Sequence, residues 1–122
     1  MRISWIGHSC FAVDAKDTRI VMDPFSADVP YEFPVLTADV VTVSHEHEDH
    51  NAAARVQGRP VAVCGAGTHR VGRLEIVGIA SSHGTGGGED RGPNTIFAFT
   101  LEGVRLAHLG DLGMPLDALQ LE

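Results

Sequence analysis

Three histidines and three carboxylates lie within six consecutive residues of this chain, His45-Glu46-His47-Glu48-Asp49-His50. The segment follows Val40–Val43, an apolar and mostly β-branched stretch typical of a buried strand. Alternate residues of an extended backbone point to the same side, so His45 and His47 can present two imidazoles to one cation. Asp49 and His50 lie where the chain is predicted to turn into a helix, and they can reach a second cation nearby.

Imidazole and carboxylate together are the ligand set that zinc and its first-row neighbours prefer, whereas calcium and magnesium take mostly oxygen. A solvated polar loop between a strand and a helix is the other interpretation of the segment. We favour the metal interpretation because this spacing of histidines behind a β-branched strand is typical of ligands. We therefore expect one or two divalent metals, zinc in the first place and manganese as the alternative.

Length and composition predict one domain with a sizeable core. The chain has 122 residues, of which 43% are hydrophobic and 20% charged, and no apolar run is long enough to span a bilayer. The N-terminus lacks the profile of a signal peptide, and two cysteines are too few for a disulfide scaffold. We expect Cys10 and Cys64 to be free, buried thiols in a cytoplasmic protein that has no membrane partner.

The charge pattern argues against nucleic acid as a partner. The formal net charge is −7, from nine basic and sixteen acidic residues. The basic residues are scattered along the sequence and form no stripe that could follow a phosphate backbone. Bound divalent cations would offset part of the negative charge.

Short apolar runs separated by turn residues predict a sheet-rich α/β chain. Gly103 lies in a short link between the last two runs, which predicts a hairpin. Asn51–Gly58 is interpreted as a short helix with Asp49 or His50 near its N-cap, and Pro115–Glu122 as the opening of another helix. The expected strands are Ile3–Ile6, Cys10–Val13, Arg19–Met22, Asp39–Ser44, Val61–Cys64, Leu74–Ile79, Ile96–Thr100 and Val104–His108.

The string His45-x-His47-x-Asp49-His50 behind a strand resembles the signature of the metallo-β-lactamase superfamily. Other segments resemble that superfamily in the same order along nearly the whole chain: Ile20–Pro24 with Asp23, Ser81–Gly84 with His83, and Leu109–Asp111. Within the superfamily, Trp5–Phe11 and Arg91–Asn94 are similar to the branch that contains ascorbate-6-phosphate lactonase.

The resemblance implies a four-layer αββα sandwich that holds its metals at the sheet edges. Members of the superfamily are commonly much longer than this chain. We therefore expect its N-terminal part, mainly one mixed or antiparallel sheet with short helices. The chain would then be a single domain, residues 1–122, truncated at its C-terminus.

The resemblance also implies a ligand set. His45, His47 and His83 would hold one metal and leave a position open for water. Asp49 and His50 would hold a second metal, and Asp111 would bridge the two. Family members supply the last histidine of the second site from their second half, and no histidine follows Asp111 here, so that site would be incomplete. The family also makes Asp23 a carboxylate that orients a ligand histidine.

This ligand set suits hydrolysis of a small ester, lactone or phosphoester. Three neutral imidazoles leave the ion its full charge, which can lower the pKa of bound water to about 7. A metal-bound hydroxide would then be the nucleophile. Asp49, Asp111 and His8 are the candidate catalytic residues. His8 would act as an acid or contact the substrate, and a structural histidine is an equally good interpretation. His108 is expected to be buried or to support a ligand.

Several alternatives remain open beside the hydrolase. One is a metal-binding half-domain without turnover, and another is a nuclease of the same fold, which the acidic charge opposes. A diiron branch of the fold carries glutamate at the position of His47, so the histidine favours hydrolysis. The zincin motif His-Glu-x-x-His is absent. Gly84–Gly92 lacks the lysine and the following helix of a phosphate-binding loop, and we interpret it as a loop that borders the substrate space.

Half of a sandwich would leave one sheet face without a partner, rich in Val, Ile, Leu and Phe. Exposed apolar surface of that extent is costly. Beside a small-molecule substrate, we therefore expect either a homo-oligomer or a missing C-terminal half that covers this face.

Overall fold

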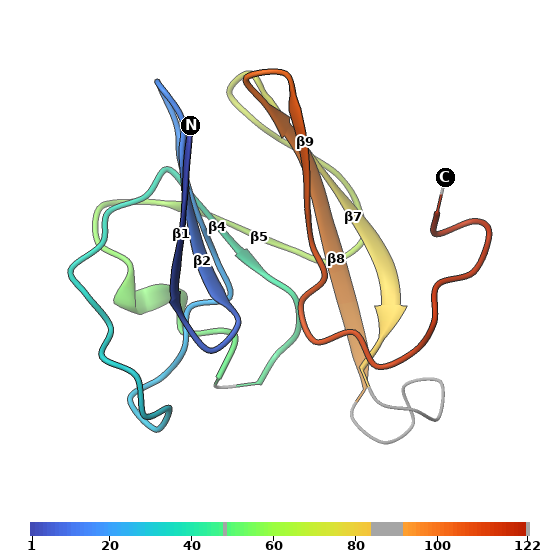
Figure 1. Cartoon of the computed structure of the whole chain (residues 1–122), viewed down its shortest axis with the longest axis horizontal. Coiled ribbons are helices and arrows are strands. Elements are labelled where there is room, and N and C mark those ends of the chain that lie inside the picture. The colour runs from blue at the N-terminus through green and yellow to red at the C-terminus, as the bar shows by residue number, and fades with distance from the viewer. Residues whose placement is uncertain (48, 84–91, 122) are drawn as a thin grey trace.

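The computed structural model describes residues 1–47, 49–83 and 92–121, whose strands form two sheets (Figure 1). The first sheet has five strands in the order β1-β2-β3-β4-β5, and the second has four in the order β6-β7-β8-β9. The described strands are β1 Arg2–Gly7, β2 Cys10–Asp14, β3 Arg19–Met22, β4 Val40–Val43, β5 Val61–Cys64, β6 Gly67–Val71, β7 Leu74–Ser82, β8 Pro93–Leu101 and β9 Val104–His108, and one 3₁₀ turn, η1, spans Ala53–Arg55.

The first sheet is mixed. Strands β1, β2 and β3 are antiparallel neighbours, whereas β3, β4 and β5 run parallel. Parallel strands end at the same edge of a sheet, so the residues that follow β3 and β4 meet there. This topology brings Asp23 next to Ser44 and His45.

The second sheet is antiparallel throughout. Its last two strands form the predicted hairpin, with Glu102 (φ 51°) and Gly103 (φ 77°) between them. Two positive φ angles in a two-residue loop are typical of a type I′ turn. The end of β7, the start of β8 and the chain after β9 share one edge, which brings His83 and Asp111 close together.

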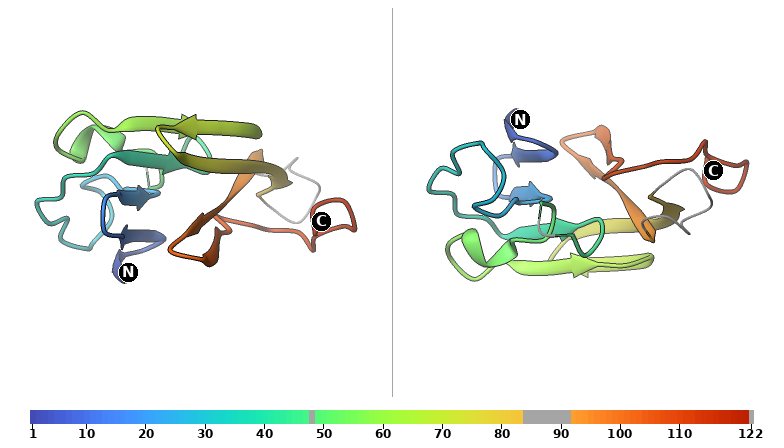
Figure 2. Two further views of the ribbon diagram at one scale, coloured as in Figure 1. Left: turned by 90° about the horizontal axis from the view of Figure 1, so that it is seen from above. Right: turned by 90° about the horizontal axis from the view of Figure 1, so that it is seen from below.

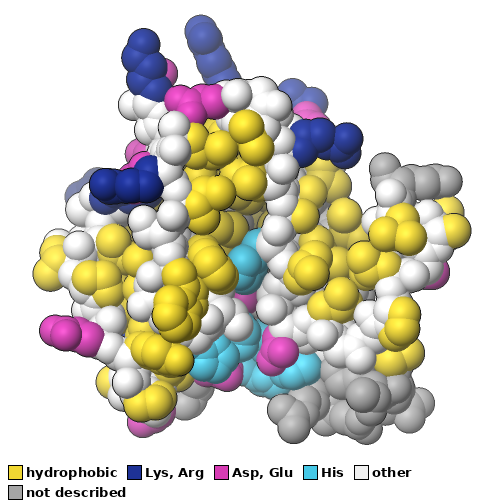
Figure 3. Space-filling model, viewed as in Figure 1, with side chains coloured by type: hydrophobic (Ala, Val, Ile, Leu, Met, Phe, Trp, Pro, Cys, Tyr) yellow, Lys and Arg dark blue, Asp and Glu magenta, His cyan; other side chains and the backbone are white. Residues whose placement is uncertain are grey.

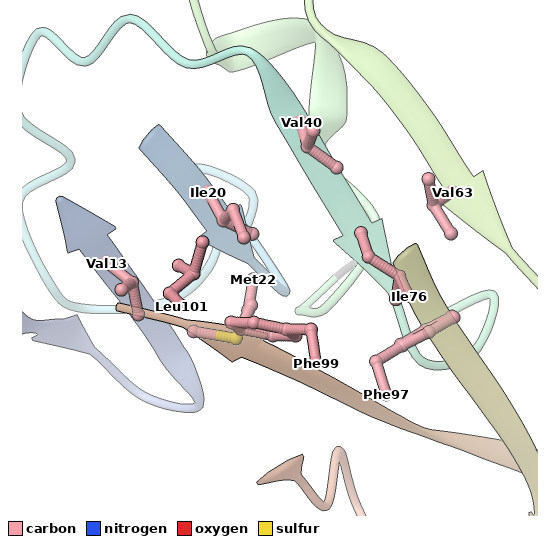
Figure 4. Packing of buried hydrophobic residues seen from close by; sticks show 9 residues of the cluster. All are labelled: Val13, Ile20, Met22, Val40, Val63, Ile76, Phe97, Phe99 and Leu101. Atoms are coloured by element: carbon pink, nitrogen blue, oxygen red, sulfur yellow. The ribbon is translucent and has the colours of Figure 1, made fainter. Parts of the chain in front are cut away.

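The main core lies between the two sheets. Val13, Ile20 and Val40 of the first sheet contact Ile76, Phe97 and Phe99 of the second (Figure 4). Views from above and below show the two groups of strands as separate layers (Figure 2). A second cluster, which includes Val41, Val43 and Phe25, covers the other face of the first sheet. Strand β4 is therefore buried on both faces, as a continuous apolar run in a parallel sheet predicts.

The sheet-rich architecture is confirmed, but the expectation of mainly one sheet was wrong in detail. The chain leaves the first sheet at Gly65 (φ 81°) and enters the second at Gly67 (φ 113°), conformations that L side chains rarely adopt. Strand β6 was not predicted, because its residues are mostly exposed and show no apolar alternation. It pairs with β7, from Gly67 opposite Gly78 to Val71 opposite Leu74.

Of the two predicted helices, one is reduced to a single turn and the other is replaced by a non-helical turn. Within Asn51–Gly58 only η1 is helical, and Ala52 at its N-cap has no side-chain hydrogen bond. Backbone N–H groups of this segment are hydrogen-bonded to other parts of the chain instead of to a helix. Ala52 N–H donates to the carbonyl of Pro24, and Gln57 N–H donates to the carbonyl of Leu36. Near the C-terminus, residues 118–121 form a turn in place of a helix.

Two expectations about the surface need correction. Cys10 is buried as predicted, but Cys64 is exposed at the end of β5. Most of the apolar residues that were expected to form a bare face lie in the core clusters instead.

The outer face of the second sheet carries a cavity of about 630 Å³ with a mixed lining that includes Val77, Ala98 and Arg105. Among the described residues, no helix has the length and apolar character needed to cross a membrane.

Candidate metal centre and active site

Three histidines converge at the edge where the two sheets meet. His45 and His47 follow β4, and His83 follows β7. Their ring centroids are 4.5 Å (His45–His47), 4.7 Å (His45–His83) and 5.2 Å (His47–His83) apart. One nitrogen atom from each ring lies within 4.8 Å of the other two. These distances suit three imidazoles around one cation.

Hydrogen bonds fix the orientation of His45. The hydroxyl of Ser44 donates to Oδ2 of Asp23 at 2.6 Å and lies 2.9 Å from Nδ1 of His45. Because the hydroxyl proton goes to the carboxylate, the hydroxyl oxygen accepts from Nδ1–H, and Nε2 keeps its lone pair. Burial, and then the charges of His50, His47 and His83, lower the pKa of His45 to about 4. His45 therefore stays neutral, as a metal ligand must.

His50 belongs to a second cluster beside the first. Its ring is fully buried and its Nδ1 lies 2.8 Å from Oδ2 of Asp23. Its Nε2 faces Oδ2 of Asp49 and Oδ2 of Asp111, each at 3.6 Å. Burial alone would lower the pKa of His50, but the hydrogen bond to Asp23 and the charges of Asp23, Asp49 and Asp111 together raise it. Asp23 thus orients His45 through Ser44 and His50 directly.

One carboxylate oxygen of Asp111 lies between the two clusters. Its Oδ2 is 2.9 Å from Nε2 of His83 and 3.6 Å from Nε2 of His50. An oxygen in this position can serve two cations at once, and its negative charge would reduce the repulsion between them. The family resemblance implied a bridging role for Asp111, and that role stays a prediction.

The turn that carries Asp111 is held by Asn94, a fully buried residue of β8. Its Nδ2 donates to the carbonyl of Leu109 at 3.0 Å, and its Oδ1 accepts from the backbone N–H of Asp111 at 3.0 Å. Gly110 between them has φ 63°, and an added Cβ would lie 2.5 Å from Oδ1 of Asn94. Only glycine therefore fits between Leu109 and Asp111.

His8 joins the second cluster from the turn between β1 and β2. Its Nε2 lies 3.2 Å from Oδ2 of Asp49. Its Nδ1 accepts a hydrogen bond from the N–H of Ser9 at 2.9 Å, so in the neutral ring the proton resides on Nε2. The indole of Trp5 donates to the carbonyl of His8 at 2.8 Å and holds this turn, in which His8 has φ 51°. His8 is thus placed as an N–H donor, and as a metal ligand it would have to give up its contact with Ser9.

The unpartnered atoms of the site fit bound cations. Among the described residues, Nε2 of His45, Nε2 of His50 and Nδ1 of His83 are buried without a hydrogen-bond partner. An unsatisfied buried polar atom costs about 1–3 kcal/mol. Metals coordinated by Nε2 of His45 and by Nε2 of His50 would remove that cost for these two atoms, and neutral imidazoles with carboxylates are suitable ligands.

Two cavities open beside the clusters. One of about 500 Å³ is lined by Ser26, Asp28, Val29, Glu46, His47 and Asp49. The other, of about 390 Å³, includes His45, His47 and the exposed Cys64 in its lining. Histidines gather in the lower half of the face in Figure 3 with carboxylates among them, whereas the lysines and arginines on this face lie toward its upper end, where further carboxylates accompany them. No lysine or arginine lines either cavity within the described part of the chain.

The structure brings together every residue that the sequence singled out for the site: His8, His45, His47, Asp49, His50, His83 and Asp111. His108 lies close to them, with Nε2 2.8 Å from the carbonyl of Ser9 and Nδ1 3.9 Å from Asp23. Ser44 and the contacts of Asn94 were not anticipated. Residues 84–91, which include most of the loop interpreted as bordering the substrate space, lie outside the described residues.

Comparisons with known proteins point to one protein family. Residues 2–122 match the family model of the beta-lactamase superfamily domain. The chain is 26% identical over 147 residues to a metal-dependent hydrolase of Desulforamulus reducens, covering 93% of this chain and 63% of the relative. It is 28% identical over 141 residues to one of Methanoculleus marisnigri, covering 93% and 59%. The chain thus spans less than two thirds of the length of these curated relatives.

A solved structure shows the same fold. This protein, from Thermotoga maritima, is described as a Zn-dependent hydrolase of the metallo-β-lactamase superfamily. It superposes on 98% of this chain and 54% of its own length, with a TM-score of 0.79 and 38% sequence identity. The family match over nearly all residues and this superposition lead to one conclusion: the chain belongs to the metallo-β-lactamase superfamily.

Proposed function

We propose that this chain forms the metal centre of a hydrolase that cleaves a small ester or lactone. The position of Asp111 carries the proposal, because one oxygen lies 2.9 Å from His83 and 3.6 Å from His50, between the two clusters. The names of the relatives support metal-dependent hydrolysis as the general reaction.

His45, His47 and His83 would hold one divalent metal. Asp49 and His50 would hold a second, with Asp111 shared between the two. When bound, such metals supply acidification of water and polarisation of the scissile carbonyl group. The nitrogen-rich set around the first metal favours zinc, and manganese is the alternative.

The remaining residues have separate tasks. Asp23 and Ser44 hold His45 and His50 with their Nε2 lone pairs directed into the site. His8 offers Nε2–H, which can stabilise the oxygen on which negative charge develops during attack on an ester carbonyl. Hydrolysis adds a hydroxyl group to the acyl carbon and a proton to the departing oxygen. Asp49, 3.2 Å from His8, is the carboxylate placed to transfer that proton.

The charge around the site supports an uncharged substrate. Asp28, Glu46 and Asp49 line the 500 Å³ cavity beside His47. Asp28 and Glu46, which would hold no metal, would repel a phosphoester, so we place esters and lactones ahead of phosphoesters as the substrate class. The same argument disfavours the nuclease, which must draw a phosphate backbone into the cavity.

A metal-binding half-domain without turnover is the second candidate. Its support lies in the second cluster, where the described residues offer Asp49, His50 and the shared Asp111, while the geometry of His8 suits an N–H donor. A second metal bound by so few protein ligands would exchange readily and give little catalysis.

The test compares substrates on protein loaded with zinc or manganese. We expect hydrolysis of p-nitrophenyl acetate or a γ-lactone to exceed that of p-nitrophenyl phosphate at least tenfold, and chelation to abolish both. The matched variant Asp28→Lys should raise phosphate-ester hydrolysis relative to the ester. Bound metal without any turnover would favour the half-domain, and preference for the phosphate ester would contradict the assigned substrate class.

A further inference from the structure

We propose that Asn94 is a positioning residue for the metal centre and that it sets Asp111 between the two clusters. The inference rests on the proposed metal site but not on the identity of the substrate. Asn94 is not one of the proposed metal ligands. The hydrogen bonds described for its side chain go to Ser81, Leu109 and Asp111, and none of them reaches an imidazole.

All polar atoms of the Asn94 side chain point to the turn or to the strand beside it. Nδ2 donates to the carbonyl of Leu109 at 3.0 Å and to the hydroxyl of Ser81 at 2.9 Å, and Oδ1 accepts from the N–H of Asp111 at 3.0 Å. The amide therefore clamps the turn on both sides of Gly110. Ser81 lies two residues before His83, so the clamp also ties the turn to the strand end that carries a ligand.

The same turn fits against the network that holds the histidines. A Cβ on Gly110 would lie 2.7 Å from the hydroxyl of Ser44, which is the group that orients His45. Next to Asn94, the N–H of Thr95 donates to the carbonyl of Ser44 at 2.8 Å. Ser44 follows β4 of the first sheet and Asn94 lies in β8 of the second, so these contacts fix the distance between ligands that come from different sheets.

The chemistry of the clamp requires an amide. The side chain donates to one backbone carbonyl and accepts from one backbone N–H at the same time, and it is fully buried. Aspartate at this position would keep the acceptor but place a negative oxygen against the carbonyl of Leu109 and close to the carboxylate of Asp111. Alanine would leave both backbone groups without a partner.

This role differs from a purely structural one in what it affects. A residue that only stabilises the fold lowers the melting temperature and leaves the properties of the metal centre unchanged. A positioning residue changes the affinity of the ion that depends on Asp111. The ion held by three histidines should be affected least, because His45 and His47 follow β4 of the other sheet and His45 is oriented by Ser44 there.

The experiment measures binding of Co²⁺ to chelator-treated protein by calorimetry and by its visible absorption spectrum. Wild type is expected to bind two Co²⁺ ions with different affinities. Binding of the second, more weakly bound ion should produce an absorption change that is distinct from that of the first. In both Asn94→Asp and Asn94→Ala, affinity for the weaker ion should fall about 10–100-fold and its absorption bands should shift, while the tighter ion changes less than threefold.

Ile76→Val is the matched control, since Ile76 is a fully buried residue of the neighbouring strand and lies in the core away from the clusters. It should lower the melting temperature without changing either affinity. The inference is overturned if Asn94→Asp, the isosteric variant, folds and binds both ions as wild type does. It is also overturned if wild type binds only one ion. If wild type binds two ions but hydrolyses no ester, the proposed function is refuted. A selective loss of affinity in the Asn94 variants would still support this inference.

Discussion

Asp23 and His50 form a pair that is entirely shielded from solvent, with Nδ1 of His50 2.8 Å from Oδ2 of Asp23. The same carboxylate accepts from the hydroxyl and the backbone N–H of Ser44, at 2.6 and 2.8 Å. One side chain at the end of β3 therefore orients a histidine of each cluster. Asp23 adopts φ 48°, a conformation that costs a non-glycine residue about 1–2 kcal/mol, and its three hydrogen bonds offset that cost.

This relationship predicts the behaviour of Asp23→Asn. The amide cannot match the acceptor pattern of the carboxylate, so Nδ1–H of His50 or the Ser44 hydroxyl loses its partner. We expect metal affinity to fall about 10–100-fold and the metal-free protein to lose about 1–3 kcal/mol of unfolding free energy. Calorimetric metal titration and urea unfolding measure both. Asp17→Asn, at an exposed position, is the matched control and should change neither quantity.

The three-histidine cluster predicts the metal content of the double variant His45→Ala/His47→Ala. Removing two of three imidazoles should abolish binding of the tighter ion, because one histidine and a carboxylate give a weak site. Elemental analysis after dialysis measures the loss. The control is His69→Ala, which removes a histidine that belongs to neither cluster and contacts the carbonyl of Gly65. Equal metal content in the double variant and the control would contradict the assignment.

Asp111→Asn should separate catalysis from folding. A neutral amide is a poorer ligand for two cations, so turnover of the ester should fall on the order of 100-fold. The melting temperature of the metal-free protein should change little, because the side chain is 44% exposed. Steady-state kinetics and thermal unfolding of the same preparation decide the matter. Full turnover with metal bound would show that the carboxylate is not needed for catalysis.

Much of this site could be predicted from local sequence. The alternation that places His45 and His47 together is a property of extended backbone, and β4 has almost the predicted bounds. The hairpin at Gly103 likewise follows from a two-residue loop with two positive φ angles. These features depend on neighbours in the sequence, and the sequence therefore reveals them.

The features that were missed depend on distant partners. Asn94 bonds Ser81, Leu109 and Asp111, which are 13, 15 and 17 residues away, so no local pattern marks it. The helix expected over Asn51–Gly58 is reduced to one turn because Gln57 also bridges to Thr37 in another segment. The division into two sheets is a third such feature, since it depends on where β6 finds its partner.

The outer face of the second sheet predicts self-association of the chain. Val77 on this face is 37% exposed. Ala98, its cross-strand neighbour, and Ala107, the next residue across the sheet, line the same cavity. Covering Val77 and the two alanines would remove their apolar side chains from water, which favours association of two copies. Light scattering at micromolar concentration should give the mass of a dimer for wild type and of a monomer for Val77→Lys. Val35→Lys, on an exposed loop, is the control, and a monomeric wild type would contradict the prediction.

His45 and His50 predict opposite effects of pH on the stability of the metal-free protein. Folding lowers the pKa of His45 from 6.5 to about 4, first through burial and then through the neighbouring histidines. Between these pH values the unfolded chain binds a proton at His45 that the folded chain does not, so stability falls as the pH is lowered through this window. The pKa of His50 is raised, so its contribution is fully present below pH 6.5 and is lost as the pH rises through the folded value.

The variant His45→Gln isolates the first effect, because glutamine does not titrate. From pH 6.5 to pH 4.5, chelator-treated wild type should lose more unfolding free energy than His45→Gln, and the difference between them should be constant above pH 7. Above pH 6.5, wild type should lose unfolding free energy that His50→Gln does not lose, since the variant lacks the group that stabilises the fold on protonation. Urea unfolding followed by circular dichroism, extended from pH 4.5 to above pH 8, measures both effects. Parallel curves for wild type and His45→Gln would show that the buried imidazole of His45 titrates normally in the folded chain.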